Sequence, residues 1–232
     1  MMKKDNEQEY TGNTDPVPNT SEYRDFDPIN GRLFELTTNP LKLTVAGQFE
    51  QNIWLEEGYG SLEDYEDLIQ HSITFTAFDE SGKCNGIARL FQGKDSVLPF
   101  LDKMSFYEKS EKSELLRLSA DGEIEELGTI AVSKELRNGL VFENLARLAY
   151  RYSYGKGIKY WGIIMEPERV KKMNRGYGFT FRQLGPTTEY QGGECAAFIM
   201  DLQEVNDNMR SKFSEAYDWF VNAPLNKINS KN

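Results

Sequence analysis

The sequence predicts an α+β (mixed α/β) fold, in which helices flank a central, mostly antiparallel sheet. Three observations support this prediction. Residues 72–91 alternate in apolar character around a turn, as paired antiparallel strands do. Residues 123–165 read as strand, helix and strand, a crossover that sets two strands parallel. Residues 179–184 and 196–202 read as two further strands joined by a loop containing Pro and Gly.

The first part of the chain contributes a polar arm and a helix. Residues 1–30 contain Asp, Glu, Asn, Thr and Pro with little periodic apolar pattern, so we expect them to be mostly disordered or an arm draped over the domain. Residues 40–57 predict a helix, because apolar side chains recur at helical spacing from Leu41 to Trp54 and Gly58 ends the run.

The segments around the hairpin have less regular patterns. Residues 60–68 are interpreted as an acidic loop or short helix before the hairpin strands. The strands themselves are expected over residues 72–79 and 86–91, with the turn between them. Residue 98 begins a connecting segment with a charged, loop-like middle.

The stretch from residue 123 to residue 165 is the most informative. It reads, in order, as a strand (123–132), a tight turn (134–139), a helix (140–154) and a strand (160–165). A helix that begins where a strand ends offers unpaired backbone N–H groups to a phosphate. Lys134 and Arg137 flank this helix start, and Glu126 lies on the preceding strand. We therefore expect a pyrophosphate or phosphopantetheine arm to bind here.

The remaining elements complete one domain. Residues 166–175 predict a short helix that ends at Gly176, and residues 204–221 carry a helical apolar stripe suited to core packing. The predicted organisation is a polar arm (1–30), a single domain (31–202) and a C-terminal helix and tail packed on that domain (203–232).

Charge is distributed unevenly along the chain. The net charge is −10, yet residues 130–182 hold eleven Lys and Arg against four Asp and Glu, a net of +7, which leaves −17 for the rest. The acidic bulk argues against nucleic-acid binding. The basic segment suits a compact anion or a small acidic protein, or is a solvated surface with no partner. No apolar run spans a membrane or resembles a secretion signal, so a cytoplasmic location is expected.

The two cysteines and the single histidine offer few ligands for a metal ion. Cys84 and Cys195 lie far apart without metal-type spacing, so we expect two reduced, mostly buried thiols. A single histidine, His71, excludes multi-histidine metal sites and leaves a Cys–His dyad as an alternative. No metal and no resident cofactor is expected.

Several short pieces, taken in order over residues 48–202, resemble one family. They are residues 49–59 (Phe-Glu-Gln-Asn-Ile-Trp-Leu-Glu-Glu-Gly-Tyr), 63–67 (Glu-Asp-Tyr-Glu-Asp), 86–90 (Gly-Ile-Ala-Arg-Leu), 126–132 (Glu-Leu-Gly-Thr-Ile-Ala-Val) and the pairs Glu168-Arg169, Gly178-Phe179 and Leu184-Gly185. Their order and spacing resemble the GCN5-related N-acetyltransferase (GNAT) superfamily. More narrowly, they resemble its branch of acyl-homoserine-lactone synthases and bacterial N-acyl amino acid synthases.

The resemblance implies an N-acyltransferase. An acyl carrier protein or acyl-CoA thioester, acting as co-substrate, would lie where two central strands splay apart. The amine of an amino acid or a similar small acceptor would attack its carbonyl. The implied donor-binding residues are Ala131, Val132, Arg137, Asn138, Gly139, Leu140 and Val141. The backbone N–H groups of Ala131 and Val132 are candidate oxyanion or pantetheine donors.

The catalytic and acceptor candidates each have an alternative interpretation. Glu126 lies among apolar neighbours that would raise its pKa and suit it to a base, or it is an outward carboxylate. Thr129 stands on the same strand, where the family usually has Arg. Asp64 and Asp67 would orient a cationic acceptor, or form a solvated acidic turn. Arg89 would bind an acceptor carboxylate, pair with those acids, or form a structural ion pair.

The departures from the family pattern affect both substrates. Glu50 and Gln51 stand where the branch usually has an Arg on the first helix, and Asn174 stands where the superfamily often has a Tyr acid. The loss of two arginines argues against homoserine lactone as the acceptor. The phosphate loop at Arg137 is one residue short, which favours a carrier-protein donor over acetyl-CoA.

The basic residues after that loop offer a docking surface. They are Arg147, Arg151, Lys156 and Lys159. The first two are four residues apart and share a helix face, so an acidic acyl carrier protein is their expected partner. Two other functions stay open: a catalytically silent acyl-binding or regulatory module, and a protein–protein adaptor that uses the N-terminal arm.

Overall fold

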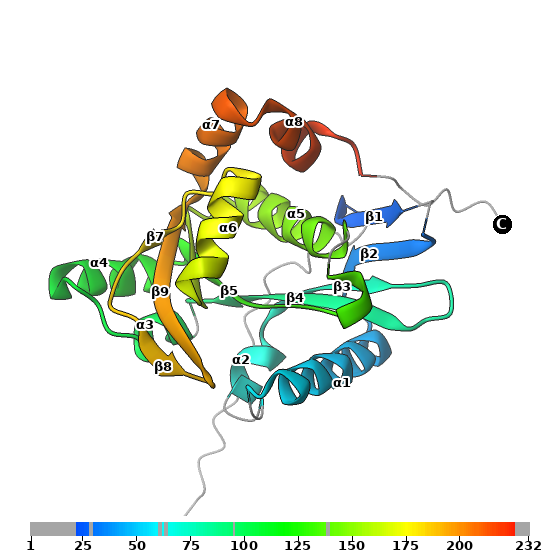
Figure 1. The fold of residues 1–232 in the computed structure, drawn as a ribbon, viewed down its shortest axis with the longest axis horizontal. Coiled ribbons are helices and arrows are strands. Elements are labelled where there is room, and N and C mark those ends of the chain that lie inside the picture. Colours follow the sequence, from blue (N-terminus) through cyan, green and yellow to red (C-terminus); the bar gives the residue numbers. More distant parts are fainter. Residues whose placement is uncertain are drawn as a thin grey trace, which may run out of the picture.

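The structure is a computed structural model that describes residues 22–27, 30–59, 62, 65–94, 96–137 and 140–225. These residues form a nine-stranded sheet in the order β1-β2-β3-β4-β5-β6-β9-β7, with β8 paired to β9 (Figure 1). The strands are β1 (Arg24–Asp27), β2 (Arg32–Leu36), β3 (Ile73–Phe78), β4 (Cys84–Gln92), β5 (Ile124–Val132), β6 (Tyr160–Met165), β7 (Arg182–Gln183), β8 (Thr188–Tyr190) and β9 (Gly193–Asp201). The predicted fold class, a mostly antiparallel sheet flanked by helices, is confirmed.

Helices cover both faces of the sheet. They are α1 (Pro40–Glu57), α2 (Glu66–Gln70), α3 (Pro99–Asp102), α4 (Lys109–Ala120), α5 (Leu140–Gly155), α6 (Pro167–Tyr177), α7 (Leu202–Lys212) and α8 (Ser214–Tyr217), with a 3₁₀ turn, η3 (Lys134–Leu136), and a π-helical turn, η4 (Asp218–Asn222). Figure 1 shows α1 and α2 on one side of the central strands, and α5, α6, α7 and α8 on the other.

Strand pairing changes at the centre of the sheet. Every neighbouring pair is antiparallel except β5 and β6, which are parallel, as the predicted crossover requires. The β5–β6 register covers Ile124↔Tyr160, Glu125↔Trp161 and Glu126↔Gly162. The register ends there, although both strands continue. The two strands therefore separate beyond Glu126 and leave a gap in the middle of the sheet.

A bulge in β5 lies beside this gap. Arg89 of β4 pairs with Thr129, but the next β4 residue pairs with Leu127, so Gly128 is an extra residue. A Cβ atom at Gly128 would lie 2.1 Å from the Phe91 ring. Only glycine fits at this point without displacing that ring.

The two faces of the sheet carry separate cores. The larger core joins α5, α6, α7 and the C-terminal segment to the strands, with Tyr150, Trp161 and Phe220 buried in it. Burying a side chain of this size stabilises the fold by about 1.5–3 kcal/mol. Two smaller clusters lie under α1, α2, α3 and α4 on the opposite face.

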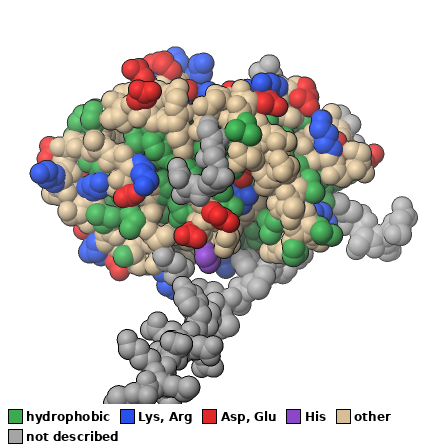
Figure 2. Space-filling view, turned by 90° about the horizontal axis from the view of Figure 1, so that it is seen from below, with side chains coloured by type: hydrophobic (Ala, Val, Ile, Leu, Met, Phe, Trp, Pro, Cys, Tyr) green, Lys and Arg blue, Asp and Glu red, His purple; other side chains and the backbone are tan. Residues whose placement is uncertain are grey.

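The first helix has its predicted bounds but a different buried face. Leu41 and Val45 are exposed, whereas Ala46 and Glu50 are fully buried. Figure 2 looks onto this side, where hydrophobic side chains are exposed among acidic and basic ones. The apolar repeat predicted the helix correctly, but the side of the helix that faces the sheet carries the Glu50 carboxylate.

Two predictions of local structure are wrong, and the predicted polar arm contributes a strand. Arg24–Asp27 forms edge strand β1 within that arm, while residues 1–21 lie outside the described part. The charged middle of the connecting segment is helix α4, which turns Leu115 inward. The strand predicted over residues 179–184 shortens to β7.

The C-terminal helices also differ from the prediction. Helix α6 runs past Gly176 and ends at Gly178, whose φ of 72° is the left-handed conformation of a glycine cap. The predicted single helix over residues 204–221 is broken at Phe213 into α7, α8 and η4. Within the described residues, no helix has the length and apolar character needed to cross a bilayer.

Candidate active site

The gap between β5 and β6 opens into a pocket of about 150 Å³. Thr129 and Ile130 of β5 line one side, and Ile164 and Met165 of β6 line another. Helix α1, the loop after it, α2 and the β8–β9 turn supply the remaining walls. The splayed gap expected from the family resemblance is therefore present and is not sealed by side chains.

Glu126 lies in this pocket and is almost completely buried, with 2 % of its surface exposed. Its Oε2 accepts a hydrogen bond from the Phe100 backbone N–H at 2.9 Å. Burial raises the pKa of its carboxyl to about 8, and the Phe100 bond opposes this shift only in part. The predicted burial and raised pKa of Glu126 are confirmed, and the alternative of an outward carboxylate is wrong.

Thr129 shares the pocket with Glu126 because of the bulge. In a regular strand, residues three apart face opposite sides of the sheet. The extra residue Gly128 restores Thr129 to the side of Glu126, and both line the pocket. Nothing in the sequence pattern alone indicated this bulge.

The backbone of β5 beyond the bulge presents alternate residues to the gap. Ser133 donates its N–H to the Asn85 carbonyl of β4 at 3.1 Å, which sets the alternation along the antiparallel pair. Ala131 is then bonded to β4, while the N–H and C=O groups of Ile130 and Val132 face away from β4 toward the gap. The Ala131 N–H therefore faces β4, whereas the N–H groups of Ile130 and Val132 face the gap, and a donor role for any of them stays a prediction.

Glu50 and Arg89 form a buried ion pair at one wall of the pocket. The Arg89 Nε donates to Glu50 Oε2 at 2.7 Å. The Arg89 Nη1 also donates to Ser72 Oγ at 3.0 Å and to Thr74 Oγ1 at 2.8 Å. Of the three predicted roles for Arg89, the structural ion pair is the one observed. Its partner is Glu50, the residue that stands where the family usually has an Arg.

Tyrosine and glutamine side chains that the sequence did not single out close the pocket. The Tyr65 and Tyr190 hydroxyls hydrogen-bond to each other, and Gln191 Nε2 donates to the Tyr65 hydroxyl at 2.7 Å. Burial raises the pKa of Tyr190, with the Tyr65 contact and the nearby Glu126 charge adding to the shift. Gln191 has a φ of 49°, a strained conformation for a non-glycine residue. Gly192 and Gly193 follow Gln191 in the sequence, and this turn signal could have drawn attention to the residue.

A second ion pair and a thiol complete the lining. Arg169 Nε lies 2.5 Å from Glu166 Oε2, and its Nη2 donates to the Tyr59 hydroxyl at 3.4 Å. Cys195 is half-buried against the pocket, and burial raises the pKa of its thiol. Cys84 is buried away from it, and neither cysteine is in a disulfide. The described residues contain no cluster of three potential metal ligands.

The acidic acceptor candidates are not brought to the pocket. Asp67 is exposed on α2, whereas Ile69 is the residue of that helix that lines the pocket. Residues 67 and 69 point to different sides of a helix, so the prediction for Asp67 is wrong. Asp64 lies outside the described residues.

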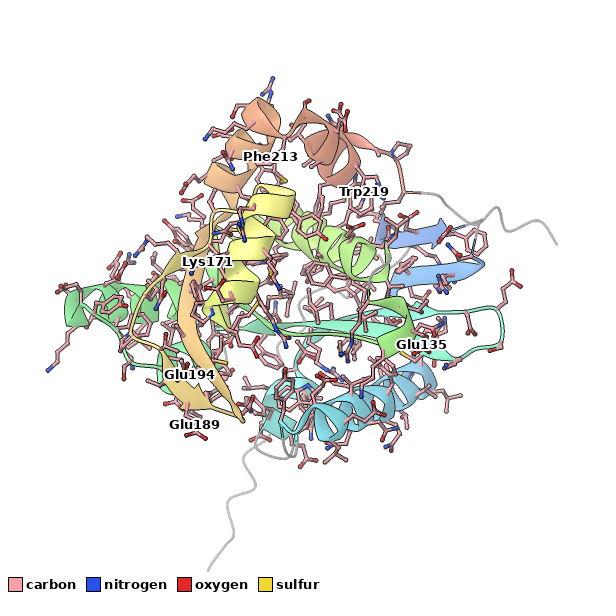
Figure 3. All side chains as sticks on the ribbon, viewed as in Figure 1. Glu135, Lys171, Glu189, Glu194, Phe213 and Trp219 are labelled. Atoms are coloured by element: carbon pink, nitrogen blue, oxygen red, sulfur yellow. The ribbon has the colours of Figure 1, made fainter. Side chains whose placement is uncertain are left out.

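The predicted phosphate site is partly occupied by ion pairs. Arg137 Nη2 lies 3.0 Å from Glu57 Oε1, and Lys134 Nζ lies 3.2 Å from Glu56 Oε2. The Arg137 hydrogen bond is the main reason why the pKa of the Glu57 carboxyl is lowered. Figure 3 labels Glu135 of the same turn, whose Oε1 lies 3.3 Å from Lys83 Nζ in the β3–β4 hairpin.

The helix start itself is described only in part. Asn138 and Gly139 lie outside the described residues. Leu140 is exposed, and the Val141 side chain is buried in the core beside Gly86, which leaves only its backbone as a possible ligand. The donor roles of Arg137, Leu140 and Val141 stay predictions.

Two of the four predicted docking residues are structural. Arg147 is buried, with its Nη1 2.9 Å from Asp25 Oδ2 and its guanidinium 4.9 Å from the Trp219 ring centre. Arg151 donates to the carbonyls of Phe220 and Ala223. Figure 3 shows Trp219 above α5, on the C-terminal segment that covers this face. The predicted docking roles of Arg147 and Arg151 are wrong.

The other two docking candidates are exposed. Lys156 follows α5 at the surface, and Lys159 pairs with Glu123 at 2.8 Å. Other basic residues of the same segment also pair with acids, as Lys171 does with Glu168 and Arg182 does with Glu111. The net +7 of residues 130–182 therefore neutralises acids from neighbouring elements to a large extent.

Comparisons with solved structures identify the fold. No family model and no curated protein matches the sequence. FeeM, an N-acyl amino acid synthase from uncultured soil microbes, superposes with a TM-score of 0.61 and 19 % identity over 78 % of this chain and 97 % of its own. BjaI, a CoA-dependent acyl-homoserine lactone synthase solved with SAM and isopentyl-CoA, gives 0.52 and 17 % over 74 % and 82 %.

A protein from Lactobacillus plantarum assigned as an N-acetyltransferase gives a TM-score of 0.53 and 13 % identity over 75 % of this chain and 99 % of its own. These likenesses show that the chain has the GNAT-like acyltransferase fold. At such identities they concern the fold and not the substrates.

Proposed function

We propose that this protein is an N-acyltransferase that moves an acyl group from an acyl-CoA or acyl carrier protein thioester to the amine of an amino acid or a similar small acceptor. One observation carries the proposal: the open gap between β5 and β6 has a buried carboxyl, Glu126, in its wall. The neighbours of the same fold are acyltransferases by name, which supports the reaction class.

In this proposal Glu126 is the general base. An acceptor ammonium must lose a proton before its nitrogen can attack the thioester carbonyl. A carboxyl whose pKa is raised to about 8 is a better proton acceptor near neutral pH than an ordinary glutamate. The new C–N bond forms, the C–S bond breaks, and the nitrogen gives up a second proton. One of the two protons neutralises the leaving thiolate, through Glu126 or solvent, and the other is released to solvent.

The backbone of β5 would bind the donor. The Ile130 and Val132 N–H groups face the gap, where they can pair with the pantetheine amides or the developing oxyanion. Thr129 adds a hydroxyl beside Glu126 on the same wall. No resident cofactor is required by these steps.

Release of free thiol tests the proposal. Purified protein is mixed with acyl-CoA or acyl carrier protein and a panel of amines, and thiol is followed with a colorimetric reagent. We expect amine-dependent release that Glu126→Gln lowers strongly. Stabilisation of the protein by an acyl donor, with no thiol released for any amine, would instead support an acyl-binding module. No effect of any donor would overturn both.

Fewer basic residues are exposed for docking an acyl carrier protein than the sequence indicated. Lys156 and Lys159 are the predicted docking residues that remain exposed. If an acidic carrier protein docks there, Lys156→Glu together with Lys159→Glu should raise the KM for acyl carrier protein and leave the KM for acyl-CoA unchanged. Equal effects on both donors would contradict carrier-protein docking at this surface.

A further inference from the structure

We infer that the acceptor carries a second positively charged nitrogen, as a diamine does, and that the Glu50 carboxylate binds it. This inference rests on the proposed acyl transfer, because it names the acceptor class for that pocket. It starts from Glu50, a carboxylate that lines the pocket, is fully buried and has one oxygen without a hydrogen-bond partner.

The two oxygens of Glu50 have different environments. Oε2 accepts from Arg89 Nε at 2.7 Å, whereas Oε1 is buried and accepts no hydrogen bond. A buried carboxylate oxygen without a donor is costly, because the hydrogen bonds that it made to water are lost. A ligand N–H at this wall of the pocket would remove that cost.

Arg89 holds Glu50 in place from outside the pocket lining. Its Nε is used by Glu50, and its Nη1 is used by Ser72 and Thr74 on the β3 side. Arg89 is not among the residues that line the pocket, whereas Glu50 is. The ion pair therefore presents its acidic partner to the acceptor.

The other charged groups of the pocket favour the same kind of ligand. Among the described lining residues, the acids are Glu50, Glu126 and Glu166, and Arg169 is the one cation. Arg169 is bound to Glu166 at 2.5 Å and to the Tyr59 hydroxyl at 3.4 Å, so this lining cation already has an acidic partner. An amino acid would bring its α-carboxylate into a pocket whose lining cation is already paired with an acid.

Aromatic rings form the wall between these acids. Trp54, Tyr59 and Tyr65 line the pocket, and their ring centroids are 5.8 Å (Trp54–Tyr59) and 5.9 Å (Trp54–Tyr65) apart. Rings attract cations through their quadrupole and accept alkyl chains by burial. A short alkyl chain with nitrogen at both ends matches this wall, with one nitrogen at Glu126 for reaction and the other at Glu50.

Three acceptors of equal chain length test the inference: putrescine, aminobutanol and γ-aminobutyrate. Acylation uses one amine of each, and the other end is a second amine (cationic), a hydroxyl (neutral) or a carboxylate (anionic). We expect kcat/KM for putrescine to exceed that for aminobutanol by about tenfold or more, which is the usual value of a charged hydrogen bond. We expect γ-aminobutyrate to be the poorest of the three.

Variants at Glu50 show whether its carboxylate causes the preference for putrescine. Glu50→Gln should bring the putrescine-to-aminobutanol ratio close to one, mainly by raising the KM for putrescine. Glu35→Gln is the matched control: Glu35 pairs with Arg24 and Lys42 outside the pocket, so the ratio should not change. Where Glu50→Gln fails to fold because Arg89 is left unpaired, the double variant Glu50→Gln/Arg89→Gln serves instead.

Calorimetric binding of putrescine, measured without any acyl donor, separates the two proposals. We expect Glu50→Gln to weaken this binding about tenfold. Glu50-dependent binding with no thiol release would support the cation site and overturn the transferase. Thiol release with equal or better use of aminobutanol or γ-aminobutyrate would support the transferase and overturn the inference, as would an unchanged ratio in Glu50→Gln.

Discussion

Glu125 and Glu126 are neighbours on β5, are equally buried, and face opposite sides of the sheet. Glu125 accepts a hydrogen bond from Ser153 of α5, which in turn accepts one from Trp161 at 2.8 Å. Glu126 faces the pocket and accepts one hydrogen bond, from the Phe100 N–H. Burial raises the pKa of Glu125 to about 7 and that of Glu126 to about 8.

The Glu125 and Glu126 carboxyls are equally buried but differ in whether they face the pocket. Both carboxyls are costly to ionise inside the fold, so a raised pKa alone does not identify a catalytic group. Ser153 and Trp161 hold Glu125 within the packed core, whereas Glu126 lies where a substrate can reach it. We therefore propose proton transfer for Glu126 and a structural role for Glu125.

The largest expected effect comes from removing each carboxylate in turn. Glu126→Gln should lower the rate of thiol release about 10²–10⁴-fold, as loss of a general base does. Glu125→Gln should leave kcat/KM within a few-fold, because its side chain does not touch the pocket. Equal losses in both variants would show that burial, and not access, is what matters here.

The dependence of stability on pH is the next largest effect. Both pKa values are raised above their unfolded values, so the folded state retains protons that the unfolded state releases. The associated stability is present at low pH and is lost as the pH rises toward about 8. For Glu126 the loss is on the order of a few kcal/mol.

Urea unfolding at about pH 5.5 and about pH 8.5 measures this loss. Glu126→Gln should flatten the fall in unfolding free energy between the two values, and Glu125→Gln should flatten it less. If the unfolding free energy of wild type and of both variants fell equally between the two pH values, the raised pKa values would be contradicted.

A smaller effect is expected from the bulge that puts Glu126 and Thr129 on one wall. Gly128→Ala places a Cβ against the Phe91 ring and should destabilise the protein by about 1–3 kcal/mol. Gly176→Ala is the matched control, because open space surrounds that helical glycine, and it should stabilise by about 0.5–1 kcal/mol. Similar melting temperatures for the two variants would argue against the tight fit at Gly128.

The smallest effect is expected at Thr129. Thr129→Val keeps the shape but removes the hydroxyl, and should lower kcat by about tenfold or less, the value of a single neutral hydrogen bond. Thr129→Ser should be close to wild type. If Thr129→Ser lowers kcat and Thr129→Val does not, the methyl group and not the hydroxyl is the contributing part.

The sequence predicted those features that depend on local pattern. The strand–helix–strand crossover, the burial of Glu126 and the gap past β5 follow from hydrophobic periodicity and from the family resemblance. The helix α1 was also predicted, but its buried carboxylate was not, because Glu50 finds Arg89 across 39 residues of chain.

Long-range packing accounts for the predictions that are wrong. Arg147 and Arg151 share a helix face as predicted, yet Asp25 and the carbonyls near residue 220 come from both ends of the chain to cover it. The bulge at Gly128 depends on the register between two strands far apart in sequence. Local spacing of charges does not reveal either arrangement.

The central claim is that the gap between β5 and β6 receives the thioester donor. Amide hydrogen exchange over residues 129–132, with and without a thioether analogue of acyl-CoA or acyl carrier protein, tests it most directly. The account predicts that the Ile130 and Val132 N–H groups exchange faster than that of Ala131 in the free protein and become protected when the analogue binds. Binding of the analogue with unchanged exchange at these two residues would contradict it.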